Sequence, residues 1–304
     1  MKRRELRDLG RGLAFTSPWI IGFSVFTLYP VLASLFYSFC DYSVLQRPVF
    51  IGLENYQRLI VDDVFWLSLT NTLIYAAFSV PLGALTSLSL ALLLNQPVRG
   101  RAFFRTLFYL PSVVPVVASS MLWLWIFNGQ YGLLNWVLRP VCAWFGALPP
   151  AWLADPAWAK PALILMSLWG VGNSMVIYLA GLQDVPKELY DAAEIDGAGA
   201  WQRFWHVTLP SISPVIYFNL IMAGIGALQV FTQVFVIAAG TGANPLEGSP
   251  ARSILFYSIY LFSTAFNDLR MGYASALAWV LFVIVAFLSW LGTKLGASRV
   301  HYSA

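Results

Sequence analysis

Charged residues are scarce in this chain. Of its 304 residues, only 11% are Asp, Glu, Lys or Arg, whereas 59% are hydrophobic. Soluble domains carry about 25% charged residues, so the composition excludes a soluble globular domain. The basic residues lie at the ends of apolar runs and not in a stripe, so the net charge of +4 does not predict a nucleic-acid partner.

Residues that bind metals or nucleotides are also few. The chain has two cysteines, Cys40 and Cys142, and two histidines, His206 and His301, without a CxxC motif or a Cys/His cluster. This spacing does not suit a zinc or haem site. The sequence has no GxxxxGK[ST] phosphate loop, so it does not predict ATP binding by this chain. We therefore expect neither a cofactor nor catalytic residues.

Long apolar runs, by contrast, are abundant. A bilayer core about 30 Å thick needs about 20 apolar residues in a helix. We predict an all-α integral membrane protein whose transmembrane domain, residues 14–293, has six helices. They are expected at residues 14–38, 68–94, 106–128, 161–183, 213–238 and 273–293. Every charged residue lies outside these ranges, which argues against an ion-coupled transporter and against an intramembrane enzyme.

Two further apolar runs, 140–154 and 253–267, are too short to span a bilayer. We expect both to be interfacial or re-entrant segments on the outer side. A spanning helix at 253–267 would instead give seven spans and place the C-terminus outside.

The distribution of basic residues predicts the orientation of the six spans. Twelve basic residues fall on the side that holds both termini: Lys2, Arg3, Arg4, Arg7, Arg11, Arg99, Arg101, Arg105, Lys187, Arg203, Lys294 and Arg299. Six fall on the other side: Arg47, Arg58, Arg139, Lys160, Arg252 and Arg270. The positive-inside rule then predicts that the N-terminal segment 1–13 and the tail 294–304 are cytoplasmic. We expect the first span to be an uncleaved anchor.

The loop 184–210 is an acidic exception on this basic side. It carries five acidic residues: Asp184, Glu188, Asp191, Glu194 and Asp196. Leu189, Ala192 and Ala193 recur at i, i+3 and i+4, which predicts one face of a short helix that Gly197 ends. A second short helix should carry Trp201, Phe204 and Trp205 on one side, which suits a membrane interface. These residues alone do not decide between two interpretations of the loop, a solvated connection and a surface that docks to another protein.

Fixed spacings in this loop carry a resemblance to a known family. Seven residues stand at the offsets of the "EAA" loop of ABC importer permeases: Asp191, Ala192, Ala193, Gly197, Val207, Leu209 and Pro210. Asp191 replaces the family's Glu, which shortens the reach of any salt bridge, and Val207 replaces Ile. The segments FIGLENY (50–56), Asn71-Thr72, LAGLQDVP (179–186) and the turn 240–245 resemble carbohydrate permeases of the maltose, lactose and glycerol-3-phosphate type.

The resemblance implies a type I ABC importer permease in the inner membrane. Such a chain is half of a channel that pairs with a second, homologous permease, two ATPase subunits and an extracytoplasmic solute-binding protein, and works by alternating access. The resemblance assigns coupling to the ATPase to loop residues: Leu189, Asp191, Ala192, Ala193, Asp196 and Gly197. Asp191 would pair with a basic residue of the ATPase.

The expected solute is a sugar, because the spans contain amide and aromatic side chains but no charged ones. Asn173 and Gln229 fall where similar permeases line the solute cavity, and Trp169, Asn219 and Gln233 are further candidates. Amides in a span either join helices or face a wet cavity, and the sequence leaves both open. A permease for glycerol-3-phosphate, a polyamine or another small solute, and a membrane scaffold without transport, also stay open.

Overall fold

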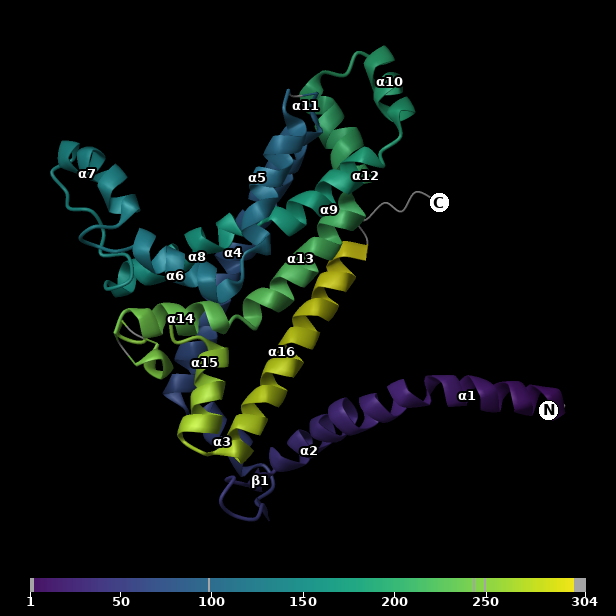
Figure 1. Ribbon diagram of the computed structural model, residues 1–304, viewed down its shortest axis with the longest axis vertical. Coiled ribbons are helices and arrows are strands. Elements are labelled where there is room, and N and C mark those ends of the chain that lie inside the picture. The colour runs from purple at the N-terminus through teal and green to yellow at the C-terminus, as the bar shows by residue number, and fades with distance from the viewer. Residues whose placement is uncertain (1–2, 98, 243, 249, 298–304) are drawn as a thin grey trace. The chain divides into compact units, whose positions relative to one another are not determined.

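The computed structural model describes residues 3–97, 99–242, 244–248 and 250–297. Residues 1–2 and 298–304 of the expected terminal segments, with Lys2 and Arg299, lie outside the described residues. The described chain is predominantly helical (Figure 1). It forms two units, one from Met1–Asp62 and Leu261–Val283, the other from Asp63–Tyr260 and Ile284–Ala304.

The first unit holds the N-terminal helices and a short hairpin. Three helical segments follow one another directly: α1 (Arg3–Phe23), the π-helical η1 (Ser24–Leu28) and α2 (Tyr29–Tyr37). The strands β1 (Cys40–Asp41) and β2 (Val49–Phe50) pair antiparallel, with Cys40 opposite Phe50. The helix α3 (Glu54–Ile60), the π-helical η4 (Ser263–Asn267) and the first half of α16 (Met271–Ala297) complete it.

Buried hydrogen bonds hold the hairpin in the first unit. The side-chain amide of Asn55 is buried and donates to the carbonyls of Ser38, at 3.0 Å, and Cys40, at 2.9 Å. The backbone of Gly272 approaches Cys40 so closely that a Cβ there would lie 2.0 Å from the Cys40 carbonyl oxygen. The FIGLENY segment therefore serves the fold, because its asparagine joins the end of α2 to the hairpin.

The second unit is a bundle around the long helix α4 (Asp63–Asn95), against which α8, α9 and α13 pack. Its other helices are α5 (Arg101–Val113), α6 (Val116–Ile126), α7 (Leu133–Trp144), α8 (Pro156–Trp169), α9 (Gly172–Gln183), α10 (Lys187–Ile195), α11 (Ala200–Arg203), η2 (Phe204–Thr208), α12 (Leu209–Ser211), α13 (Ser213–Leu228), α14 (Thr232–Gly240) and η3 (Pro245–Glu247). Two helices, α15 (Tyr257–Phe262) and α16, contain a boundary between the units, so each begins in one unit and ends in the other.

Several helices of the second unit are broken where one straight span was expected. The helices α5 and α6 meet at 99°, because Val114 precedes Pro115 and takes the extended conformation that proline imposes on its predecessor. The helices α8 and α9 meet at 48° across Gly170 and Val171. The expected span 213–238 is interrupted between Leu228 and Thr232.

Among the described residues, three helices are long and apolar enough to cross a membrane: Gly10–Tyr37, Asp63–Asn95 and Met271–Lys294. Three bent pairs bring the number to six if each pair is one span: Arg101–Val113 with Val116–Ile126, Pro156–Trp169 with Gly172–Gln183, and Ala200–Ser211 with Ser213–Leu228.

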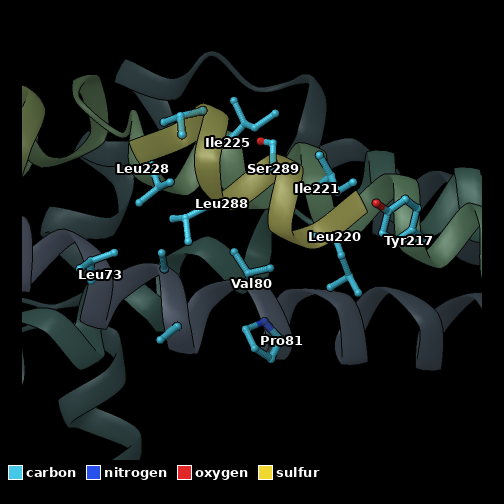
Figure 2. Close-up of a pocket in the computed structure, with 15 residues that line it drawn as sticks. Leu73, Val80, Pro81, Tyr217, Leu220, Ile221, Ile225, Leu228, Leu288 and Ser289 are labelled. Atoms are coloured by element: carbon cyan, nitrogen blue, oxygen red, sulfur yellow. The ribbon is translucent and has the colours of Figure 1, made fainter. Parts of the chain in front are cut away.

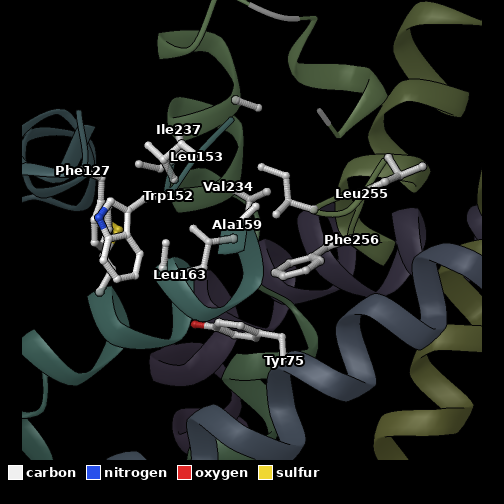
Figure 3. Close-up of a cluster of buried hydrophobic side chains, with 14 of the residues drawn as sticks. Tyr75, Phe127, Trp152, Leu153, Ala159, Leu163, Val234, Ile237, Leu255 and Phe256 are labelled. Carbon is white, nitrogen blue, oxygen red and sulfur yellow. The ribbon is translucent and has the colours of Figure 1, made fainter. Parts of the chain in front are cut away.

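Two buried apolar clusters stabilise the second unit. One gathers Tyr75, Phe127, Leu163, Val234 and Phe256 with their neighbours from α4, α6, α8, α14 and the segment before α15 (Figure 3). The other joins α4 and α9 to the residues that precede α10 and α13, through Ala91, Tyr178, Leu182 and Ile212. The second cluster therefore forms the base from which the 184–210 loop projects.

Long-range hydrogen bonds complete the first of these clusters. The side-chain amide of Asn71 donates to the carbonyls of Arg252, at 2.9 Å, and Leu255, at 3.1 Å. The hydroxyl of Thr72 accepts from the backbone amide of Tyr257 at 2.8 Å. The Asn71-Thr72 pair therefore joins α4 to the segment that leads into α15.

Candidate functional site

The loop 184–210 is a helical hairpin whose first helix ends at Gly197. The helix α10 closes with two backbone bonds, from Gly197 N to the Glu194 carbonyl at 3.0 Å and from Ala198 N to the Ala193 carbonyl at 2.9 Å. This is the Schellman pattern, and Gly197 has the left-handed φ of +76° that it requires. The helix end predicted at Gly197 is confirmed. The chain then reverses, so that α11 and η2 return beside α10 (Figure 1).

Side-chain contacts fix the two arms of the hairpin to each other. The Tyr190 hydroxyl on α10 lies 3.0 Å from the Thr208 hydroxyl on η2. The Arg203 guanidinium donates to the Glu194 carboxylate at 3.2 Å. The side-chain carbonyl of Gln202 accepts from the Gly199 amide at 2.8 Å and caps α11. The hairpin is therefore connected at its base and at its tip.

A hollow of about 460 Å³ lies between these arms. Five of the six residues expected to couple to an ATPase line it: Leu189, Ala192, Ala193, Asp196 and Gly197. The sixth, Asp191, is exposed on α10 outside the lining. The opposite arm lines the hollow with four residues that were not among those expected to couple: Gln202, Arg203, His206 and Val207. Because the two alanines are small, the hollow stays open to a side chain from another protein.

The expected aromatic face of the second arm is present. The rings of Trp201, Phe204 and Trp205 contact one another, with centroids 5.6 to 6.0 Å apart. Trp201 and Trp205 are both exposed. The exposed carboxylates of Glu188, Asp191 and Asp196 lie on or next to α10. The hairpin thus carries acidic groups on one arm and exposed indole rings on the other.

A second hollow, of about 300 Å³, lies where the broken helices of the second unit meet α4. Its walls come from α4, from both sides of the α8–α9 break and from both sides of the α13–α14 break. Hydroxyl and amide groups line it: Tyr75, Ser79, Ser87, Ser167, Ser174, Tyr178, Asn219 and Gln233. No charged residue belongs to this lining. Breaks of this kind expose backbone groups at the ends of half-helices, where membrane transporters bind solutes.

The structure places the five expected solute residues in three environments. Asn219 and Gln233 line the 300 Å³ cavity, and the Asn219 amide donates to the Val215 carbonyl of its own helix at 3.0 Å. Asn173 and Gln229 are exposed and stand at the breaks, at the start of α9 and the end of α13. Trp169 ends α8 and packs edge-on against Trp123, with ring centroids 6.1 Å apart.

Sequence reasoning missed the hydroxyl residues that α4 contributes to this cavity. Tyr75, Ser79, Gly83 and Ser87 recur every four residues and share one face of the helix. Small and hydroxyl residues at this period mark the side of a membrane helix that packs on protein. This periodicity was the available signal, but it does not distinguish a cavity wall from a helix contact.

A larger hollow of about 620 Å³ has the wrong chemistry for a polar solute. It lies between α4, α13 and the second half of α16 (Figure 2). Its lining is aliphatic apart from Tyr217 and Ser289. A sugar buried here would leave most of its hydroxyls without partners, which costs about 1–3 kcal/mol for each group. The smaller polar cavity is therefore the better candidate.

Comparison with known proteins gives consistent matches over the whole chain. A family model described as "Binding-protein-dependent transport system inner membrane component" matches residues 79–299. The probable ABC transporter permease protein YesP of Bacillus subtilis (strain 168) is 43% identical, over 100% of this chain and 96% of YesP. The lactose transport system permease protein LacF of Rhizobium radiobacter is 38% identical, over 92% of both chains.

A further relative and a solved structure agree with these matches. The trehalose/maltose transport system permease protein MalF of Thermococcus litoralis is 33% identical, over 97% of this chain and 96% of MalF. A chain of a bacterial alginate ABC transporter, solved in complex with an alginate pentasaccharide-bound periplasmic protein, aligns with a TM-score of 0.83 and 22% identity over 99% of both chains. The likeness to this structure concerns the fold.

Proposed function

The chain belongs to the family of binding-protein-dependent transport system inner membrane components, as its 184–210 loop predicted, and we propose that it forms half of the translocation path of an ATP-driven importer for a sugar or a sugar-like solute. Under this proposal it lies in the inner membrane with six spans and cytoplasmic termini. The observation that carries the proposal is that one unit holds both a hydrogen-bonded loop with a hollow between its arms and a polar cavity without charged lining residues.

A sugar suits the groups at the cavity and the breaks. Hydroxyls and neutral amides donate and accept hydrogen bonds, and the half-buried indole of Trp169 at the α8–α9 break offers an aromatic face to a sugar. The absence of charged lining residues disfavours a solute with a net charge. Relatives are named for lactose and for trehalose and maltose transport, which supports the same class.

The exposed amides at the breaks supply the solute path in this proposal. Asn173 and Gln229 stand on apolar helices, where contact with lipid would leave their amides without hydrogen bonds. We infer that both face a water-filled path that a second, homologous permease closes. Gln233 and Trp169 would extend this path, whereas the hydrogen bond of Asn219 within its own helix supports a structural role for it.

The loop hollow supplies the contact with an ATPase subunit in this proposal. A side chain of the ATPase would enter between the arms, against Leu189, Ala192 and Ala193. Asp191, exposed on the same helix, would pair with a basic residue of the ATPase. The bonds from Tyr190 to Thr208 and from Arg203 to Glu194 would make the hairpin move as one body.

Reconstituted transport tests the proposal. The chain is purified with its second permease and two ATPase subunits, placed in liposomes, and supplied with the solute-binding protein. We expect ATP-dependent uptake of a labelled sugar that neutral oligosaccharides inhibit and that glycerol-3-phosphate or spermidine does not. Inhibition by either of these instead would assign the other solute class. Uptake without ATP, or no transport of any of these solutes, would contradict an ATP-driven importer.

A further inference from the structure

The helix α7 exposes a continuous apolar face. Leu133, Trp136, Val137, Val141 and Trp144 follow the i, i+3, i+4 spacing that places side chains on one side of a helix. All five are exposed, Trp136 by 70% and Trp144 by 88%. The apolar surface continues past the helix end, through Phe145 and Leu148. Soluble surfaces rarely carry an apolar patch of this kind, so this face requires a partner.

The opposite side of α7 is fixed to the second unit. Leu134 and Leu138 pack against the buried cluster of Figure 3. Asn135 is buried, donates to the carbonyls of Gly129 and Pro150, and accepts from the Trp152 indole at 2.7 Å. These bonds set the rotation of α7 about its axis. The contacts of α7 with the second unit therefore turn its apolar face away from that unit.

The connections of α7 keep it near the membrane. It follows α6 after residues 127–132 and precedes α8 by residues 145–155. Each of these neighbours belongs to a bent helix pair apolar enough to cross a membrane. Six extended residues reach about 20 Å at most, so the start of α7 lies within that distance of the end of α6. Figure 1 shows α7 beyond the end of α6, away from α10 and α11.

The chemistry of the face suits lipid. Tryptophan is enriched at the level of the lipid headgroups, where its ring is buried and its N–H stays wet. Arg139 is the only charged residue of α7, and it lies exposed between the apolar face and the packed face. Its guanidinium donates to the Gln130 carbonyl, and its remaining N–H groups can reach lipid phosphates while the helix lies in the interface.

We propose that α7 and residues 145–148 form an interfacial anchor that lies in the outer leaflet, with Leu133, Trp136, Val137, Val141 and Trp144 toward the acyl chains and Arg139 toward the phosphates. The anchor holds the outer ends of α6 and α8 at a set depth in the bilayer. The inference rests on the proposed six-span topology with cytoplasmic termini and not on the identity of the solute.

Site-directed spin labelling tests the anchor in the assembled complex. Trp136→Cys and Trp144→Cys are each made in a Cys142→Ser background, and Cys40 stays because it is fully buried. Cys142→Ser alone measures background labelling, and Glu247→Cys, at an exposed charged residue, is the water-facing control. The complex is placed in liposomes of phosphatidylethanolamine and phosphatidylglycerol. Collisions of the nitroxide with oxygen and with a nickel chelate are then compared.

We expect oxygen collisions to exceed nickel-chelate collisions at positions 136 and 144, and the reverse at 247. Frequent collisions with the nickel chelate at positions 136 and 144 would overturn the anchor. If adding the solute-binding protein abolished those collisions, the face would be assigned to that protein. Low access to both reagents would assign it to another subunit. ATP-driven uptake, measured in the same liposomes, reports separately on the transport function. Because both tryptophans are exposed, their replacement removes no packing within the chain.

Discussion

Replacing Gly197 by valine isolates the backbone geometry of the 184–210 hairpin. Gly197 has a φ of +76°, and a Cβ at this position would meet no atom within 4 Å. The substitution therefore creates no clash with neighbouring residues. Its cost comes from the left-handed conformation, about 1–2 kcal/mol for an L-residue and most for a β-branched one. This free energy lowers the population of the native hairpin about 5- to 30-fold relative to its alternatives.

Binding of the purified ATPase subunit to the permease pair measures this effect. Only the native hairpin presents the hollow, so the half-saturating ATPase concentration should rise by up to the same 5- to 30-fold for Gly197→Val. Gly197→Asn should bind nearly as the wild type, because asparagine tolerates this conformation. Gly197→Pro should be worse than valine, because proline cannot adopt a positive φ and also loses the amide bond to Glu194. Gly197→Leu should resemble valine.

Gly199→Val is the matched control within the same loop. Gly199 has a φ of −70° and a ψ of 170°, which valine adopts readily, and its Cβ would approach only the Gln202 side chain at 3.8 Å. We expect wild-type binding from this variant. Equal weakening by Gly197→Val and Gly199→Val would instead show that the effect follows added bulk and not the backbone conformation.

Four other substitutions or treatments test the remaining assignments. Asn173→Ala should lower solute-stimulated ATP hydrolysis more than basal hydrolysis by the complex, whereas equal losses would point to a structural role. Thr72→Val removes the acceptor of the Tyr257 amide and should destabilise the protein by about 1–3 kcal/mol, measured as earlier thermal unfolding in detergent. Gly272→Ala should lower the unfolding temperature because its Cβ would lie 2.0 Å from the Cys40 carbonyl oxygen, whereas Gly22→Ala, with open space around it, should not. Burial raises the pKa of the Cys40 thiol, so at pH 7 a smaller fraction of it is thiolate than for an exposed cysteine. Maleimide should therefore modify the partly exposed Cys142 first. Faster modification of Cys40 would contradict its burial.

The helices of this protein were largely predictable because their signal is local. An apolar run of about 20 residues has few alternatives to a helix in a membrane. The expected range 68–94 lies within α4, and 273–293 lies within α16. The helix end at Gly197 was predictable for the same reason, since a helix followed by glycine often closes through a left-handed residue.

The helix breaks were less predictable because they depend on packing as well as on sequence. Pro115 gave a local sign of the bend between α5 and α6. The interruption between Leu228 and Thr232 contains no proline, so the sequence carried no comparable sign of it. Predicted as one straight span, 213–238 would have placed Gln229 and Gln233 about 6 Å apart along one face. In the structure Gln229 is exposed and Gln233 lines the cavity.

The contacts of Asn71 were beyond sequence reasoning altogether. Its partners, Arg252 and Leu255, lie more than 180 residues away along the chain. One sequence shows that Asn71 is polar and stands early in an apolar helix, but not which distant carbonyls it meets. Asn219, expected to contact solute, lines the polar cavity and also donates to the Val215 carbonyl one turn earlier, and its sequence context does not distinguish these two roles.

The order of elements along the chain connects the 184–210 hairpin to the polar cavity. The helix α9 leads into the hairpin and α13 leads out of it, and each has its break at the far end, at the cavity. The two helices approach closely where a Cβ on Gly181 would lie 3.0 Å from a Val215 methyl group. The Tyr178, Leu182 and Ile212 cluster joins them at the base of the hairpin. A displacement of the hairpin by an ATPase would therefore carry α9 and α13 together, and the breaks at Gly170 and Gln229 are where the chain can bend. Asn173 and Gln229 stand at those two bends, so the same motion that engages the hairpin would change the spacing of the amides proposed to hold the solute.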